Sequence, residues 1–500
     1  MKCNYSHGFY LMGRIIRLFK YICNPLRNMK KILLCLAGMV LFTQLSAQKF
    51  KVTLNAPQFK SGIAYLTFAN GNNFSVEDSA AFSRGVAIFK GTRKLPGGVY
   101  TIFFPGKRLR SDFLVDKEQV ISIKADTTDL LNKFIVTGSK ENILFVQYQK
   151  YTSFKGKFME TERVAYTQSK TKADSSLHEN KYNQYQNELT AYRNSIIKQH
   201  PKSMLAMLLN AMKEPELPIR KPLTQKDSLT NYYYYKQHYW DGITFMDDRV
   251  IRTPFFMPRL ERYYREVIVQ SADSIIKDID YKLLLARTSP EMYKLLLNWL
   301  TDEYINPKYM GQDAIFVHLF EKYHSKGLTS WLNEKQMETI SRRAYMLMSN
   351  LIGEKAADLE MIDTAGKPTP LYGVDADYTV LIFWDPNCGH CKVEIPKVDS
   401  VYRASWKSHD LKIYAVLSED ARADWIKYIN SNNLTDWIHV RQTKEMEQAD
   451  YAAQKAGFRQ LYDVTITPRL YLLDKEKRII AKGLSWEQLN DLLQLKWKKN

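Results

Sequence analysis

The sequence predicts a multidomain protein: a small all-β, sandwich-like domain, then a mostly α-helical domain, then a C-terminal α/β domain. The chain has 500 residues, enough for about three domains of roughly 150 residues each. Short β-branched and aromatic runs separated by turn residues fill residues 48–140, whereas residues 141–350 repeat apolar residues every three or four positions. From residue 351 to 500, strand-like and helix-like stretches alternate, which is typical of an α/β domain.

Residues 1–47 contain a predicted export signal. The segment "MKKILLCLAGMVLFTQLSAQ" begins at Met29 with two lysines, continues with an apolar run, and ends in small residues, so we expect translation to start at Met29 and cleavage near Ala47. The apolar run, Ile32–Phe42, has eleven residues and is short for a membrane span. The alternatives are an uncleaved anchor or a buried helix. Export predicts a location in the cell envelope or periplasm.

Charge indicates a solvated surface and no nucleic-acid partner. The formal net charge is +19, and loss of residues 1–47 removes seven Lys or Arg and no acidic residue, leaving +12. The remaining basic residues alternate with acidic ones, as in "KGKFMETERVAY" and "NEKQMETISRRAY". No run of 18 apolar residues occurs, so no transmembrane span is expected in the mature chain.

The all-β domain, residues 48–140, is predicted from short strand-like runs ending in Gly, Pro or Asn. Their pattern favours a sandwich. The runs are "KFKVTLNA", "GIAYLTFANG", "GVAIFKG", "VYTIFFPG" and "KEQVISIKA".

The helical domain, residues 141–350, is predicted from period and from start signals. Ser289 stands at an N-cap position and Pro290 at the first helical position of "SPEMYKLLLNWL". Apolar and aromatic residues recur at helical spacing elsewhere in the segment. They include Tyr185, Leu189, Tyr192 and Ile196, and further on Met337, Ile340, Ala344 and Leu347.

The C-terminal α/β domain, residues 351–500, is predicted to hold a mixed sheet. "YTVLIFW" is almost continuously apolar, as expected of a strand buried on both faces. A helix is expected from Cys388, and another near residues 421–431. Further strands are expected at "LKIYAVL", "WIHV", "RLYLLD" and "RIIAKG", with a closing helix at "SWEQLNDLLQL".

The segment "FWDPNCGHCKVEIP" carries the candidate chemistry. Cys388 and Cys391 are separated by two residues at the start of a predicted helix, a spacing that lets their sulfurs form a redox-active disulfide. The positive end of the helix favours a thiolate on Cys388, the attacking nucleophile, and His390 should lower its pKa further. Cys391, one turn inside the helix, is the expected resolving thiol.

Other uses of the two cysteines are less compatible with the sequence. Cleavage near Ala47 removes Cys3, Cys23 and Cys35, so the mature chain holds no further cysteine. A zinc site needs two more ligands, and the remaining histidines lack ligand spacing, so no metal and no cofactor are expected. An inert disulfide between such near neighbours would close a very short loop and stabilise the fold little.

These residues resemble the active-site region of thioredoxin-fold proteins, specifically the TlpA/ResA-type thiol–disulfide oxidoreductases of bacterial envelopes. The resemblance runs from about Ile352 to the C-terminus, where "LIGEKAADLEMIDTAGKPTPLY" is similar to the family's N-terminal extension. "YDVTITPRLYLLD" is similar to the segment that carries the cis-proline, here Pro468. The β and helical segments before residue 350 resemble uncharacterised domains that precede such a domain in Bacteroidota envelope proteins.

The resemblance implies roles for individual residues. Cys388 matches the attacking and Cys391 the resolving cysteine. Glu394 matches an acidic residue that could relay a proton from Cys391, the alternative being a surface carboxylate. Thr467 is expected to pair with a bound peptide strand. The expected supporting residues of the active site are Trp384, Gly389, His390, Thr467 and Pro468.

Two departures make this site unlike that of thioredoxin itself. Ile382 stands where thioredoxin has a buried aspartate, and Asn387 stands where it has a tryptophan before the first cysteine. The pair Gly389–His390 resembles the corresponding pair of protein disulfide isomerase. The site is therefore expected to be more oxidising than that of thioredoxin.

The leading hypothesis is an exported thiol–disulfide oxidoreductase of protein-disulfide reductase or isomerase type. Its expected partners are protein thiols and disulfides of the envelope and an upstream redox donor. The alternative is an envelope binding or scaffold protein with an accessory redox domain, because about 300 residues of the mature chain precede the redox segment. A peroxidase is less compatible, since no peroxidatic cysteine motif accompanies the Cys-x-x-Cys pair.

Overall fold

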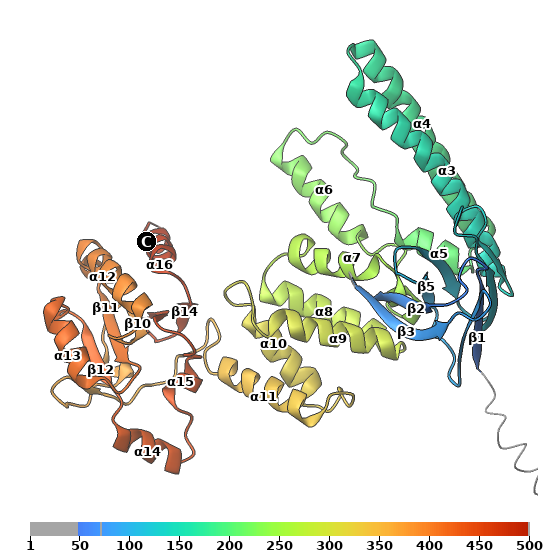
Figure 1. The fold of residues 1–500 in the computed structure, drawn as a ribbon. Helices are drawn as coiled ribbons and strands as arrows, with labels where there is room; N and C mark the ends of the chain where they lie inside the picture. Colours follow the sequence, from blue (N-terminus) through green and yellow to red (C-terminus); the bar gives the residue numbers. More distant parts are fainter. Residues whose placement is uncertain (1–48, 71–72, 499–500) are drawn as a thin grey trace, which may run out of the picture. The chain divides into compact units, whose positions relative to one another are not determined.

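The computed structural model describes residues 49–70 and 73–498 (Figure 1). The predicted export signal lies outside the described residues, together with Cys3, Cys23 and Cys35. The chain divides into two compact units. The first unit extends to Thr244 and includes Asp248–Glu261; the second contains Phe245–Asp247 and the chain from Arg262 onward. The helical segment is therefore divided between the two units.

The first unit begins with a β-sandwich, as the sequence predicted. One sheet has the strand order β4-β1-β7-β8 and the other β3-β2-β5-β6. Alternate side chains from both sheets meet in one core; in β1 every second residue is buried. The strands are β1 Phe50–Asn55, β2 Ile63–Asn70, β3 Asn73–Ala81, β4 Val86–Gly91, β5 Gly98–Phe103, β6 Arg110–Val115, β7 Val120–Lys124 and β8 Ile135–Thr137.

Three of these strands were missed in the sequence: β3, β6 and β8. β3 lies at the edge of its sheet and buries few side chains, so its sequence "NFSVEDSAA" shows little apolar alternation. β6 begins with polar residues, and β8 has only three residues. Pairing with β2, β5 and β7 provides the hydrogen bonds that define them.

Helices follow the sandwich within the first unit. The two longest, α3 and α4, pack against each other as an antiparallel pair (Figure 1). Ser139 and Thr171 cap their N-termini through side-chain oxygens. Leu189 and Ile196 of the predicted helical pattern are buried in α4. The helices are α3 Lys140–Gln168, α4 Lys172–Gln199, α5 Met204–Ala211, α6 Gln225–His238, the 3₁₀ turn Asp248–Arg252 and α7 Phe256–Arg262.

The second unit continues with helices. α9 begins at Pro290 after Ser289, as predicted, although the Ser289 hydroxyl makes no capping hydrogen bond. The pattern predicted near residue 340 forms α11, which buries Ile340, Ala344 and Leu347. The helices are α8 Ala272–Ala286, α9 Pro290–Tyr304, α10 Asp313–Leu319 and α11 Glu334–Met348, with π-helical turns at Tyr263–Val267 and Phe320–His324.

The C-terminal part of the second unit is the predicted α/β domain. Its elements alternate as expected from the sequence, and α12 contains the candidate cysteine pair at its start. The elements are β9 Ile362–Asp363, β10 Tyr378–Trp384, α12 Gly389–Ala404, β11 Leu411–Leu417, α13 Arg422–Ser431, β12 Ile438–Arg441, α14 Lys444–Ala452, α15 Phe458–Leu461, β13 Arg469–Asp474, β14 Ile479–Lys482 and α16 Trp486–Trp497, with 3₁₀ turns at Leu371–Gly373 and Trp406–His409.

A six-stranded mixed sheet forms the centre of this domain, in the order β14-β13-β10-β11-β12-β9. β10 pairs parallel with β11 and antiparallel with β13. Its side chains alternate between two cores: Ile382 and Trp384 pack with α12, whereas Leu381 and Phe383 pack on the other face. Because β10 is buried on both faces, its sequence is almost continuously apolar, and the loop that follows it starts from a rigid element.

None of the helices in the described part of the chain combines the length and apolarity needed to cross a membrane.

Candidate active site

The Cys-x-x-Cys segment lies between the end of β10 and the start of α12. Cys388 is the N-cap residue of α12, and the helix begins at Gly389. The backbone N–H of Cys388 donates to the Asp385 carbonyl (3.2 Å), and the carbonyl of Cys388 accepts from the Lys392 N–H (3.1 Å). These bonds hold the loop so that the Cys388 side chain sits at the positive end of the helix.

The second part of the site comes from a segment 79 residues further along the chain. The peptide bond Thr467–Pro468 is cis, as the resemblance implied. The Cys388 Sγ–H donates to the Thr467 carbonyl oxygen at 3.4 Å. β13 begins at Arg469 and pairs with β10 at Phe383, so sheet pairing brings Thr467 beside the cysteine.

The two sulfurs differ in exposure. Cys388 is half-buried, whereas Cys391 is buried with 1% of its surface exposed. Both thiols are free in this structure. Cys391 packs in the core that contains Trp384 and Ile395. A substrate therefore has access to Cys388 alone.

The two sulfurs also differ in acidity. Burial acts to raise the pKa of Cys388, but hydrogen bonds to its sulfur outweigh burial and leave the pKa below its ordinary value of 9.0. The Thr467 side chain, Cys391 and the His390 backbone make these bonds. For Cys391, burial dominates and raises the pKa to about 12. Cys388 is thus the sulfur that ionises first.

Glu394 does not contact Cys391 through any hydrogen bond or ion pair found in the described residues. Its carboxylate instead accepts from the Lys397 ammonium at 3.3 Å, one turn further along α12. The proton-relay role of Glu394 stays a prediction, and the contact with Lys397 is the one expected of the alternative, a surface carboxylate.

The expected supporting residues occupy different environments. Trp384 is completely buried, with its ring 5.3 Å from that of Tyr428, so it supports the site from within the core and does not reach a substrate. Gly389 and His390 are exposed on the first turn of α12. A Cβ atom at Gly389 would meet no atom within 4 Å outside its chain neighbours and its own helix backbone, so this position on the first turn is open. Thr467 and Pro468 lie beside Cys388, as expected.

Two contacts from α13 were not foreseen in the sequence. The Asn387 side-chain amide donates to Asp424 at 3.0 Å, which ties the active-site loop to this helix. Tyr428 packs on Trp384; burial, and then the charge of Cys391, raise the pKa of its hydroxyl. Nothing in the sequence connects residues 424 and 428 to the cysteine motif. α13 comes later in the chain, and only tertiary packing brings it close to the two cysteines.

Among the described residues, no group of three or more His, Cys, Asp or Glu side chains is arranged to hold a metal ion.

Comparisons with known proteins match the chain in two places. Residues 352–482 match the AhpC/TSA family, and residues 50–145 match a domain of unknown function, DUF4369. No curated protein matches the chain.

Among solved structures, one match is a domain of a possible thiol-disulfide isomerase from Cytophaga hutchinsonii, with 38% sequence identity and a TM-score of 0.27. The match covers 30% of the present chain and 95% of the Cytophaga domain. The thioredoxin domain of a thiol-disulfide oxidoreductase from Bacteroides vulgatus is 26% identical, covers 29% of this chain and 95% of that chain, and has a TM-score of 0.25. A thioredoxin-like protein from Bacteroides caccae is 20% identical, covers 57% of this chain and 99% of that chain, and has a TM-score of 0.43.

The mixed sheet, the cysteine pair at the start of α12 and the cis-proline beside it define a thioredoxin-fold protein. The family match over residues 352–482 describes this part of the chain more closely. Residues 352–482 form a TlpA-like thioredoxin-fold domain that matches the AhpC/TSA family, and a DUF4369 domain at residues 50–145 precedes the helical region.

Proposed function

We propose that this protein is an exported thiol–disulfide oxidoreductase that exchanges disulfides with proteins of the cell envelope through Cys388 and Cys391. The observation that carries the proposal is the asymmetry of the two sulfurs. Cys388 is accessible, sits at a helix N-terminus and has a lowered pKa, whereas Cys391 is buried behind it with a raised pKa. The names of the relatives from Cytophaga and Bacteroides vulgatus support the same activity.

The reaction proceeds in two exchanges. The Cys388 thiolate attacks one sulfur of a substrate disulfide; an S–S bond forms between them, and the other substrate sulfur leaves as a thiolate and takes up a proton. Cys391 then loses its proton and attacks the Cys388 sulfur, forming the Cys388–Cys391 disulfide and releasing the second substrate thiolate. The substrate gains two electrons and the enzyme loses two. An upstream dithiol donor returns the enzyme to its reduced form by the reverse exchange.

Thr467 contributes to substrate positioning in this proposal. Its backbone lies next to the reacting sulfur, as the 3.4 Å contact shows. An extended substrate segment that hydrogen-bonds to this backbone would place its own cysteine in front of Cys388, in the manner of an added β-strand. Backbone pairing requires no particular side chain, so it suits an enzyme that acts on several proteins.

The activity is tested with the reduced chain beginning at Gln48 and a peptide that contains one disulfide. We expect stoichiometric reduction of the peptide in a single turnover, and catalytic reduction with a dithiol in excess. Cys388→Ser should lower the rate by at least about a thousandfold, because removal of a nucleophile leaves only binding. Binding of the peptide without reduction would favour the scaffold alternative, and faster oxidation by hydrogen peroxide than by any disulfide would favour a peroxidase.

The envelope location rests on the segment Met29–Ala47. Such a segment directs export into an oxidising compartment, where protein disulfides form. An enzyme of this type would therefore find its substrates there. We expect the envelope form of the protein to begin close to Gln48. N-terminal sequencing of protein from a periplasmic extract measures this, and recovery of the uncleaved chain from the cytoplasm would contradict it.

A further inference from the structure

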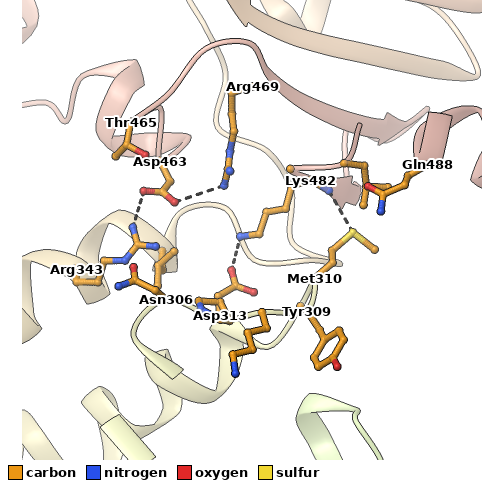
Figure 2. A pocket seen from close by; sticks show the side chains of 16 residues that line it. Asn306, Tyr309, Met310, Asp313, Arg343, Asp463, Thr465, Arg469, Lys482 and Gln488 are labelled. Atoms are coloured by element: carbon orange, nitrogen blue, oxygen red, sulfur yellow. Dashed lines mark hydrogen bonds and ion pairs between the residues drawn. The ribbon is translucent and has the colours of Figure 1, made fainter. Parts of the chain in front are cut away.

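A second site adjoins the cis-proline segment within the second unit. It is a cavity of about 480 Å³ between the α9–α10 connection, α11 and the loops on either side of β13 and β14. Figure 2 shows the side chains around it. Arg343, Asp463, Arg469, Lys482 and Asp313 provide charged groups to its wall, and Lys308 stands on its rim with two thirds of its side chain exposed.

The charges of this cavity do not cancel. Asp463 is shared by two guanidinium groups, that of Arg343 at 2.6 Å and that of Arg469 at 3.5 Å, so one carboxylate faces two cations (Figure 2). The Lys482 ammonium and the Asp313 carboxylate form a buried pair that balances itself.

Lys308 adds a further positive charge. Its ammonium lies 3.9 Å from Glu303, a carboxylate that already accepts two hydrogen bonds from Arg265, at 2.9 and 2.6 Å. The lining residues therefore present four cations against two anions. A pocket with a surplus of positive charge favours an anionic ligand.

The guanidinium of Arg469 lies against Gly483. A Cβ atom at Gly483 would lie 3.2 Å from one terminal nitrogen of its guanidinium, so the absence of a side chain there leaves room for the planar group. The Nε of Arg469 has no hydrogen-bond acceptor among the described residues. A guanidinium has five N–H donors, and Asp463 accepts from one nitrogen of this group, so Arg469 keeps donors for a second carboxylate.

Two residues that line the cavity are sequence neighbours of Thr467, the residue that contacts the reacting sulfur. Thr465 and Arg469 both line it, and they stand two residues before and two residues after Thr467, which contacts Cys388. An extended segment advances by about 7 Å over two residues. A substrate chain that pairs with the backbone at Thr467 and runs toward Thr465 would bring a side chain two or three residues from its cysteine to this wall of the cavity.

We propose that this cavity is a specificity site for an acidic side chain of the substrate polypeptide, two or three residues from the cysteine that reacts. The inference rests on the proposed function and names its substrate class: envelope proteins whose disulfides are flanked by Asp or Glu. The acidic group docks between Arg469 and Lys308, while the backbone of the substrate runs past Thr467.

The test compares three disulfide peptides that differ only two and three residues from one cysteine, with Glu, Gln or Lys at both positions. With the reduced chain beginning at Gln48, kcat/KM should be highest for the Glu peptide and about tenfold lower for the Lys peptide. The preference should shrink between 20 mM and 500 mM sodium chloride, because salt screens exposed charges.

Variants assign the preference to this cavity. Lys308→Glu and Thr465→Glu each place a carboxylate at the rim and should reduce the Glu-to-Lys ratio about fivefold. Lys335→Glu makes the same change of charge as Lys308→Glu on an exposed position of α11 that does not line the cavity, so it should leave the ratio unchanged.

The outcomes separate this inference from the proposed function. Turnover of none of the peptides would reject the oxidoreductase itself. Equal turnover of all three would reject the specificity site and leave the oxidoreductase intact. If inorganic phosphate, at matched ionic strength, inhibited all three peptides equally and Lys308→Glu relieved it, the cavity would bind a free anion and the substrate assignment would be overturned.

Discussion

Cys391→Ser should accumulate covalent complexes between Cys388 and its substrates, and Cys388→Ser should accumulate very few. In the wild type, Cys391 resolves the mixed disulfide from its buried position behind Cys388. Without that thiol the mixed disulfide persists until another thiol reaches it. Non-reducing gels of envelope extracts, followed by mass spectrometry of the additional bands, measure the complexes directly.

The expected difference between the two variants is large because acidity and exposure act in the same direction. The pKa of Cys391 is raised to about 12 and that of Cys388 lies below 9.0, so the thiolate fractions at neutral pH differ by at least about a thousandfold. The more basic thiolate of Cys391 is intrinsically the better nucleophile, which reduces the advantage of Cys388 by a factor of roughly thirty. A preference of about thirtyfold remains from ionisation, and the 1% exposure of Cys391 increases it further.

The same assignment predicts a pH profile. Because the pKa of Cys388 is lowered, its thiolate is already formed below pH 9, and the rate of alkylation should fall as the pH drops through that pKa. Iodoacetamide should modify one thiol per reduced chain at neutral pH, at Cys388. Equal trapping by the two variants, or alkylation of Cys391 first, would reverse the assigned roles. The double variant Cys388→Ser/Cys391→Ser serves as the background.

Asp313→Ala should destabilise the second unit by about 3–5 kcal/mol, the usual cost of leaving one partner of a buried ion pair without the other. Lys482 is 8% exposed, and its ammonium also donates to the backbone carbonyl and the side chain of Asn350, both at 2.6 Å. These two oxygens of Asn350 are neutral, so they cannot replace the negative charge of Asp313 beside the Lys482 ammonium. Urea unfolding followed by tryptophan fluorescence measures the change.

The loss of stability that Asp313→Ala causes through the unpaired charge has an upper limit, because Lys482 can lose its proton. Burial lowers the pKa of Lys482 from 10.5 while Asp313 acts to raise it, so removal of Asp313 lowers the pKa further. Neutralising a lysine at pH 7 costs at most about 5 kcal/mol, which is 3.5 pKa units at 1.36 kcal/mol each. The folded variant then binds fewer protons than the unfolded chain, so its stability should rise with pH until about 10.5.

A matched control separates the loss of charge balance from the loss of packing. Asp313→Leu combined with Lys482→Met replaces the pair by apolar side chains and should cost far less than Asp313→Ala, because no charge remains buried alone. A change below about 1 kcal/mol for Asp313→Ala would contradict the prediction. A fragment beginning at residue 351 lacks both Asp313 and Asn350, so it should be less stable than one beginning at Arg262.

The order of the elements and the position of the cysteine pair were predictable from the sequence. Ser289 and Pro290 mark the start of α9, the apolar run of β10 marks a strand buried on both faces, and the Cys-x-x-Cys spacing indicates a helix start. Each of these signals is local: a turn, a cap or a period depends on residues only a few positions apart. Edge strands such as β3 were missed because pairing, not pattern, defines them.

Only the tertiary structure decided which residues surround the dithiol. Trp384 is completely buried in the core. The carboxylate of Glu394 contacts Lys397, and the side-chain amide of Asn387 donates a hydrogen bond to Asp424 of α13. The cavity beside the cis-proline takes its charges from residues between 308 and 482. These arrangements follow from side-chain packing between elements far apart in the chain, and residue spacing along a sequence has no information on which distant side chains will meet.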